Sequence, residues 1–182
     1  MNNIIVNYIK SLRIRRVIMK NSIKESYEKL LASKEFKHKG FLCGAFLICD
    51  IEDINNTEWQ IDFYNTESDT ITTYLVSKKI EITDNSKILK KEDVKIEKLN
   101  INEIKTSFED IKNKIENILN KYKETAAKIT VILQKQKIPM WNIIYITKKF
   151  NILNIKINAE NGEVIEEKTV PLVSFERGGV KN

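Results

Sequence analysis

The feature that most constrains the fold is a pattern that occurs twice, a tryptophan followed by apolar residues that alternate with polar ones. Trp59 opens "WQIDFYNTESDTITTYLVSKKIEI" and Trp141 opens "WNIIYITKKFNILNIKINAENGEV". The offset of 82 residues that aligns the tryptophans also aligns three further pairs without a gap: Ile61 with Ile143, Phe63 with Tyr145, and Leu75 with Ile157. Alternation of this kind predicts strands with one covered face, and its repetition favours an internal duplication.

A helix is predicted before each of these hairpins. Ser22 and Glu25 have the spacing of a capping box, as do Ser107 and Asp110. The first helix should turn four residues inward: Ile23, Tyr27, Leu30 and Leu31. The second should bury the stripe Phe108, Ile111, Ile115, Ile118, Leu119 and Tyr122. Ser26 and Ser107 lie 81 residues apart, close to the offset of the hairpins, which supports the duplication.

Between each helix and its hairpin a further strand is expected. The run from Phe41 to Cys49 is apolar at both odd and even positions, which predicts a strand buried on both faces. The segment "KITVILQK" takes the corresponding place in the second half. Asn161 and Gly162 supply the chemistry of the last turn.

These elements predict an α+β fold made of two αβ repeats, each a helix packed on an antiparallel sheet. One basic N-terminal helix is expected before the two repeats. The expected divisions are listed here: basic helix 1–21, first repeat 22–85, charged connector 86–106, second repeat 107–173, and tail 174–182. The connector keeps some apolar alternation and could contribute an edge strand.

The second half resembles the PepSY-like family, whose signature is a Trp or Tyr strand followed by V-x-V-D-A-x-T-G-x-V. The matching positions are Trp141, Tyr145, Ile155, Ile157, Asn158, Ala159, Gly162 and Val164. Asn158 replaces the usual Asp and Asn161 the usual Thr. The resemblance covers about residues 107–170 and, more weakly, 26–82. It implies a module that binds or inhibits partners, often outside the cytoplasm, and it names no catalytic residue.

The charge of the chain is concentrated at its start. Of the formal net charge of +6, residues 22–182 carry only +1. The other five charges are Lys10, Arg13, Arg15, Arg16 and Lys20. A nearly neutral body disfavours nucleic acid as a partner. The amphipathic arm could contact an anionic membrane, an acidic protein or nucleic acid, or it could pack on the sheet with its arginines in water.

Cysteine, histidine and acidic residues give little sign of catalysis or metal binding. Cys43 and Cys49 lie six residues apart on the predicted strand, about 20 Å, too far for a disulfide, so buried reduced thiols are expected. The only histidine, His38, lies in a polar loop between two lysines. The acidic turn at Asp50, Glu52 and Asp53 has no EF-hand spacing, and we interpret it as solvated.

The two tryptophans could line a ligand groove, but alternation places both on the apolar face of a strand, where large aromatic residues are usually core. We therefore expect a noncatalytic binding or regulatory module with no cofactor and no catalytic or metal site. The alternative is a small enzyme with an unrecognised active site between the repeats. The start of the chain lacks the pattern of a secretory signal, so a cytoplasmic location is expected, with peripheral membrane contact as an option.

Overall fold

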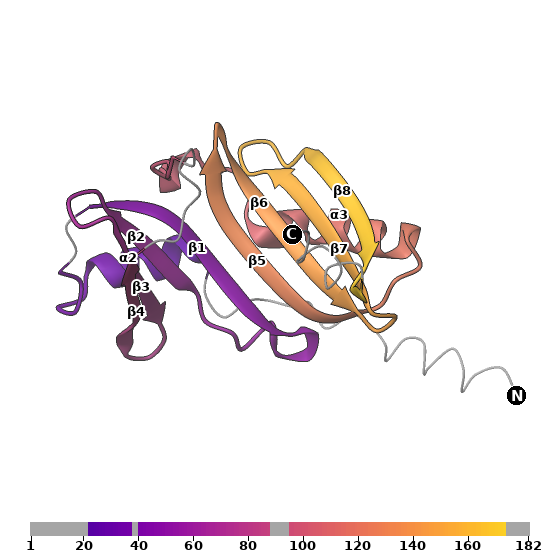
Figure 1. The fold of residues 1–182 in the computed structure, drawn as a ribbon, viewed down its shortest axis with the longest axis horizontal. Coiled ribbons are helices and arrows are strands. Elements are labelled where there is room, and N and C mark those ends of the chain that lie inside the picture. The colour runs from indigo at the N-terminus through magenta and orange to yellow at the C-terminus, as the bar shows by residue number, and fades with distance from the viewer. Residues whose placement is uncertain (1–21, 38–39, 88–94, 174–182) are drawn as a thin grey trace, which may run out of the picture.

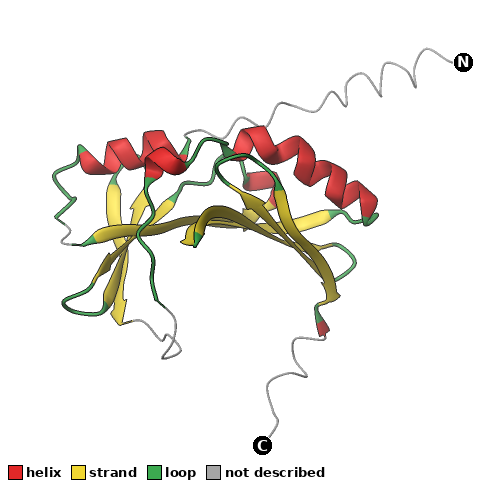
Figure 2. Ribbon diagram, turned by 90° about the horizontal axis from the view of Figure 1, so that it is seen from above, coloured by secondary structure: helices red, strands yellow, loops and turns green. Residues whose placement is uncertain are grey.

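The protein has an α+β fold in which two helices lie on one face of a single antiparallel sheet (Figures 1 and 2). The computed structural model describes residues 22–37, 40–87 and 95–173. The sheet has eight strands in the order β4-β3-β2-β1-β5-β6-β7-β8. Figure 2 shows the sheet arched beneath the helices, and no described helix covers its other face.

Within each half, one helix precedes four strands. The first half contains α2 (Ile23–Leu31), β1 (Phe41–Asp50), β2 (Gln60–Asn65), β3 (Thr70–Val76) and β4 (Ile80–Lys87). The second contains α3 (Phe108–Lys121), β5 (Ala126–Gln136), β6 (Ile138–Thr147), β7 (Asn151–Asn158) and β8 (Val164–Pro171). Two short 3₁₀ turns, η1 (Ile51–Asp53) and η2 (Ile101–Glu103), complete the described elements.

The strand order places the two halves side by side. β1 and β5 pair with each other at the centre of the sheet, so β4 and β8 form its edges. β4 runs to Lys87, past the boundary at residue 85 that the sequence suggested, but the described residues 95–106 of the connector, whose alternation suggested an edge strand, form no strand. The eight strands therefore share one continuous sheet.

Both helices begin as the sequence predicts. The Ser22 hydroxyl accepts a hydrogen bond from the Glu25 N–H, and the Glu25 carboxylate accepts one from the Ser22 N–H. Ser107 and Asp110 make the same reciprocal contacts at the start of α3. The predicted stripe of α3 faces the sheet, but Leu31 of α2 is 45% exposed, so its inward assignment was wrong. Leu31 is the last residue of α2, where the helix leaves the sheet.

The tryptophans are core residues, as expected. Trp59 is 1% exposed and Trp141 is fully buried, and their ring centroids lie 6.1 Å apart. The Trp141 indole N–H donates to the carbonyl of Thr106, 2.9 Å away. This bond fixes the chain just before α3, so Trp141 joins the helix layer to the sheet.

The alignment of the two halves was wrong in two places, one in the helices and one in the hairpins. Ser26 lies inside α2, and the residue equivalent to Ser107 is the capping Ser22. In the hairpins, Ile157 pairs with Trp141 and is fully buried, whereas Val76, also fully buried, donates its N–H to the carbonyl of Trp59. Val76 therefore takes the place that the alignment gave to Leu75. The element order matches, but the loops between the elements differ in length.

The prediction that β1 is buried on both faces was also wrong. Leu47 is fully buried on the helix side, but its neighbour Ile48 is 60% exposed. An apolar run indicates only that both faces of the strand are apolar. It leaves open whether a second layer covers them.

The cysteines are both free and half-buried, so they are less enclosed than expected. Burial, followed by the nearby Asp62 carboxylate, raises the pKa of the Cys43 thiol to about 12. Burial also raises the pKa of Cys49. The thiol form is therefore favoured at neutral pH.

Candidate binding surfaces

Two features of the described chain could bind another molecule, and they lie on opposite sides of the sheet. The first is the side of the central strands that no described helix covers, which we call the open face. Its central residues alternate along each strand with fully buried residues on the helix side. These residues are Phe46, Ile48, Thr130, Ile132, Asn142, Ile144, Asn154 and Lys156.

Strand register brings the open-face residues into rows. Ile48 pairs with Thr130, which pairs with Ile144, and Phe46 pairs with Ile132. Cross-strand partners have Cβ atoms about 5 Å apart, so these side chains form a contiguous apolar area on neighbouring strands.

Charged side chains bordering this area are largely paired. The Lys128 ammonium lies 2.8 Å from the Asp50 carboxylate, and the Lys156 ammonium lies 2.6 Å from the Glu166 carboxylate. Each pair joins neighbouring strands. The open face consequently has little unbalanced charge. Such a surface is better suited to contact a protein with mixed polar and apolar groups than to bind a polyanion.

Two amide oxygens on the open face lack a hydrogen-bond partner. The Oδ1 atoms of Asn142 and Asn154 are buried, and no described group donates to them. Asn142 lies between Ile132 and Lys156, and Asn154 lies between Ile144 and Lys168. A buried acceptor without a donor costs about 1–3 kcal/mol, so these oxygens lower the stability of the folded chain.

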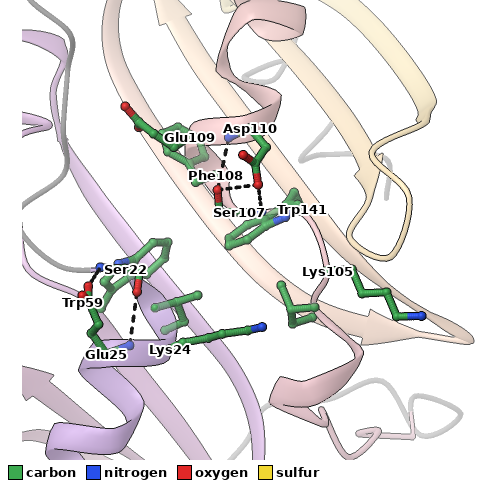
Figure 3. Close-up of a pocket in the computed structure, with 12 residues that line it drawn as sticks. Ser22, Lys24, Glu25, Trp59, Lys105, Ser107, Phe108, Glu109, Asp110 and Trp141 are labelled. Atoms are coloured by element: carbon green, nitrogen blue, oxygen red, sulfur yellow. Dashed lines mark hydrogen bonds between the residues drawn. The ribbon is translucent and has the colours of Figure 1, made fainter.

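The second feature is a pocket of about 370 Å³ between the starts of the two helices (Figure 3). Both halves of the chain contribute to it. Its lining consists of Ser22, Ile23, Lys24, Glu25, Trp59, Ile104, Lys105, Ser107, Phe108, Glu109, Asp110 and Trp141. We call this space the helix-start pocket.

The acidic groups of the helix-start pocket are engaged in capping. The Ser22 N–H and then its hydroxyl lower the pKa of Glu25, and the Ser107 hydroxyl and then its N–H lower the pKa of Asp110. Both carboxylates are therefore charged at neutral pH and hold the helix starts. A general acid would need a raised pKa instead.

The structure places the sequence candidates as follows. Lys10, Arg13, Arg15, Arg16, Lys20 and His38 lie outside the described residues. Asp50, Glu52 and Asp53 are exposed, in line with a solvated turn. The described residues contain no cluster of three or more His, Cys, Asp or Glu able to hold a metal ion.

Sequence reasoning missed the open face, and it weighed a ligand groove at the two tryptophans that border the helix-start pocket but favoured a core role for them. The open face depends on whether a second layer covers that side of the sheet, which strand patterns do not encode. The helix-start pocket depends on two helices from different halves beginning side by side. The paired capping boxes were the available signal, because they mark two helix starts that a duplication would bring together.

No family model matches the chain, and no curated protein matches it. Among solved structures, a putative lipoprotein from Clostridium difficile 630 has a similar fold, with a TM-score of 0.55 and 15% sequence identity. The similarity covers 84% of this chain and 95% of that one. It supports the α+β fold and carries no functional assignment. In the described residues, no helix is long and apolar enough to cross a membrane.

Proposed function

We propose that this chain is a noncatalytic binding module that docks a protein partner on its open face. The observation that carries the proposal is the exposure of Ile48, which is 60% exposed although β1 is paired on both sides at the centre of the sheet. Apolar surface in such a position is usually covered in a finished assembly.

The composition of the open face supports a protein as the partner. Its apolar rows offer area for burial, and its paired charges at Asp50–Lys128 and Lys156–Glu166 would fit at a polar rim. The partner is thus expected to bring apolar side chains to the rows and polar side chains to the rim.

Two parts of the sequence interpretation enter this proposal. We infer that the halves are copies of one PepSY-like unit, supported by the shared element order and by the two capping boxes. The turn after β7 fits that resemblance, since Asn158 Oδ1 accepts from the Glu160 N–H and Gly162 has a positive φ of 73°. An Asp at position 158 could accept the same bond.

An enzyme with its active site between the halves is the alternative, and the helix-start pocket is where that site would lie. The engagement of Glu25 and Asp110 in capping favours the binding module. The basic arm and the cytoplasmic location stay predictions. A peripheral membrane role would add the arm to the docking surface.

Photocrosslinking tests the proposal in cells that make the protein. A photoreactive amino acid at position 48 should capture a defined partner, whereas one at Leu31, an exposed apolar residue of α2, should not. The captured protein is then purified, and its affinity for the full chain is measured. Ile48→Arg should weaken binding by at least about tenfold, or 1.4 kcal/mol, and Leu31→Arg should leave it unchanged.

Both arginine variants should fold, because Ile48 is 60% exposed and Leu31 is 45% exposed, which leaves room for the arginine side chains to extend into solvent. The proposal is wrong if the partner crosslinks from position 31 and not from position 48. It is also wrong if Ile48→Arg binds the captured partner as tightly as the original chain.

A further inference from the structure

Three chain segments meet at one end of the second half of the sheet, where β6 and β8 end and β7 begins (Figure 1). We call them together the hairpin tip, and they are residues 123–125, 147–151 and 171–173. The Lys148 N–H donates to the Thr125 carbonyl at 2.8 Å, which joins the first segment to the second. The Leu172 N–H donates to the Phe150 carbonyl at 2.8 Å, which joins the third to the second.

The two most exposed large apolar residues of the described chain belong to the hairpin tip. Phe150 is 71% exposed and Val173 is 69% exposed, ahead of Ile48 at 60%. Val173 directly follows Leu172, whose N–H bonds to Phe150, so the two exposed side chains belong to neighbouring segments. Apolar surface that gathers in this way marks a contact with a protein or a membrane.

Phe150 also has an unusual backbone conformation. Its N–H donates to the Thr147 carbonyl at 3.0 Å and closes a three-residue hairpin loop. Its φ of 59° lies in the left-handed region, where such loops usually have glycine because a side chain there costs free energy. The phenylalanine therefore suits neither the backbone nor the core, and its ring is accessible for a contact outside the chain.

The charge of the hairpin tip is positive. Lys123, Lys148 and Lys149 are exposed, and Glu124 is the one acidic residue of the three segments, so their net charge is +2. The Glu124 carboxylate accepts a hydrogen bond from the Asn151 side chain at 2.7 Å. The Lys149 ammonium donates to the Lys123 carbonyl. Both lysines of the hairpin loop directly precede the exposed ring in the chain.

The hairpin between β5 and β6, at the opposite end of the sheet, has a different charge balance. It contains Lys137 and Ile138, which is 36% exposed. The Lys137 N–H donates to the Glu97 carboxylate at 3.2 Å, and the Lys135 ammonium lies 2.8 Å from the Glu103 carboxylate. Carboxylates offset the lysines there, so this hairpin serves as an internal control.

The size of the hairpin tip favours a membrane over a protein as its partner. A stable protein interface takes about 800 Å² and 20–30 residues from each side, more than these three short segments provide. A bilayer, in contrast, accepts a single protruding ring at the boundary of its acyl chains, while lysine ammonium groups stay among the headgroups. Nucleic acid would attract the lysines but would leave the apolar side chains exposed.

We propose that the hairpin tip contacts an anionic membrane surface, with the Phe150 ring inserted at the acyl boundary and Lys148 and Lys149 at the headgroups. Burial of the ring and attraction of the lysines add to each other. The acidic residues Asp50 and Glu52 follow β1, which β5 separates from this hairpin, so the hairpin meets the membrane and the acidic turn does not. The contact uses strand ends and leaves the central rows of the open face unoccupied.

Cosedimentation of the full chain with vesicles tests the proposal. Vesicles made of equal parts of phosphatidylglycerol and phosphatidylcholine should bind the chain at low salt. Vesicles of phosphatidylcholine alone should bind it at least about fivefold more weakly, because the attraction of the lysines is lost. Replacing Lys148 and Lys149 together by Gln should lower binding to the anionic vesicles by a similar factor, and added salt should reduce this difference.

Phe150→Gly separates a membrane contact from a structural role. Glycine suits a φ of 59°, so the thermal midpoint should stay the same or rise. Loss of the ring should lower binding to anionic vesicles at least about fivefold. Ile138→Gly, the same type of change in the control hairpin, should leave vesicle binding unaltered. Circular dichroism checks that both variants are folded.

The charges at the start of the chain are tested separately. Phe150→Gly should lower vesicle binding by the same factor when Arg13, Arg15 and Arg16 are replaced by Gln. Loss of all vesicle binding on replacing the arginines alone would assign the contact to the N-terminal residues and overturn the proposal.

Three further results would overturn it. The first is the absence of binding to anionic vesicles at low salt. The second is Phe150→Gly binding them as tightly as the original chain, or Ile138→Gly losing as much binding as Phe150→Gly. The third is binding to a DNA duplex as tight as to the vesicles and unchanged by Phe150→Gly, which would identify a general attraction to polyanions. None of them involves the partner of the open face, so this test and the crosslinking test can fail separately.

Discussion

Replacing Asn142 by leucine should stabilise the protein, although it alters a half-buried residue in the middle of the sheet. The side chains are nearly the same size, so packing changes little. The substitution removes a buried Oδ1 that has no donor and places an apolar group between Ile132 and the stem of Lys156.

The magnitude follows from the cost of the unpartnered oxygen. A buried acceptor without a donor costs about 1–3 kcal/mol. Part of the amide stays accessible, so the lower part of that range applies and we expect a gain of about 1 kcal/mol. In a chain of 182 residues, this corresponds to a rise of about 2–4 °C in the thermal midpoint.

Asn158→Leu is the matched control. Asn158 is also half-buried, at the end of β7, but its Oδ1 accepts the N–H of Glu160 at 2.8 Å. Leucine there leaves that N–H without its acceptor, so the midpoint should fall. Urea unfolding of the original chain and of the two variants gives their free energies of unfolding. The dependence of each free energy on urea concentration, the slope, is compared between the three proteins.

The reasoning is refuted if Asn142→Leu lowers the free energy of unfolding or leaves it unchanged at an unaltered slope. A rise in both variants would also refute it, because the gain would then reflect the general strand preference of leucine.

Three further outcomes are expected. Ser107→Ala should cost about 1 kcal/mol in urea unfolding by removing the α3 cap, and Ser107→Thr should retain most of the stability. In the native protein, the Cys43 thiol should react slowly with an alkylating agent at pH 8, and its rate should rise about tenfold per pH unit up to its pKa of about 12. In urea-unfolded protein the thiol should react at once. Fast labelling of the native protein at pH 8 would contradict the burial of Cys43. If the basic arm docks on anionic membranes, replacing Arg13, Arg15 and Arg16 by Gln should reduce cosedimentation with anionic vesicles at low salt and leave the thermal midpoint nearly unchanged.

The raised pKa of Cys43 also fixes the sign of a pH effect on stability. The folded thiol has a pKa of about 12, above the value of about 8.5 for an unfolded cysteine. The stability that the buried, protonated Cys43 thiol contributes to the folded state is fully present below about pH 8.5, and it is lost as the pH rises toward 12. Burial raises the pKa of Tyr145 as well, which adds in the same direction. Cys43→Ala should therefore reduce the alkaline loss of stability, measured by urea unfolding between pH 8 and pH 10.

Local signals in the sequence predicted much of the fold. The capping boxes located both helix starts, because a serine and an acidic residue three positions later satisfy backbone groups wherever the helix packs. Alternation placed Ile61 and Ile143 on the covered face, since side chains of a strand point to opposite sides in turn. These signals act within a few residues and need no knowledge of the rest of the chain.

The strand register and the covering layers of the sheet were harder to predict from the sequence. The alignment at one offset set Leu75 against Ile157, yet Leu75 lies on the open side and Ile157 on the helix side. A change of one residue in a loop reverses the faces of every later side chain in the strand. Loop length is therefore the information that an alternating pattern lacks.

The open face shows why the functional candidate was harder to predict than the fold. Ile48 and Leu47 have equally apolar side chains, and only the helices distinguish them, because they cover one side of β1 and not the other. In the sequence alone, an isoleucine on the open face looks the same as one buried in the core. Asn142 and Asn154 are more informative, because an amide in the middle of a central strand has no reason to persist in a core. Amides of this kind, alternating with fully buried residues such as Ile143 and Ile155, lie on a sheet face that no described helix covers.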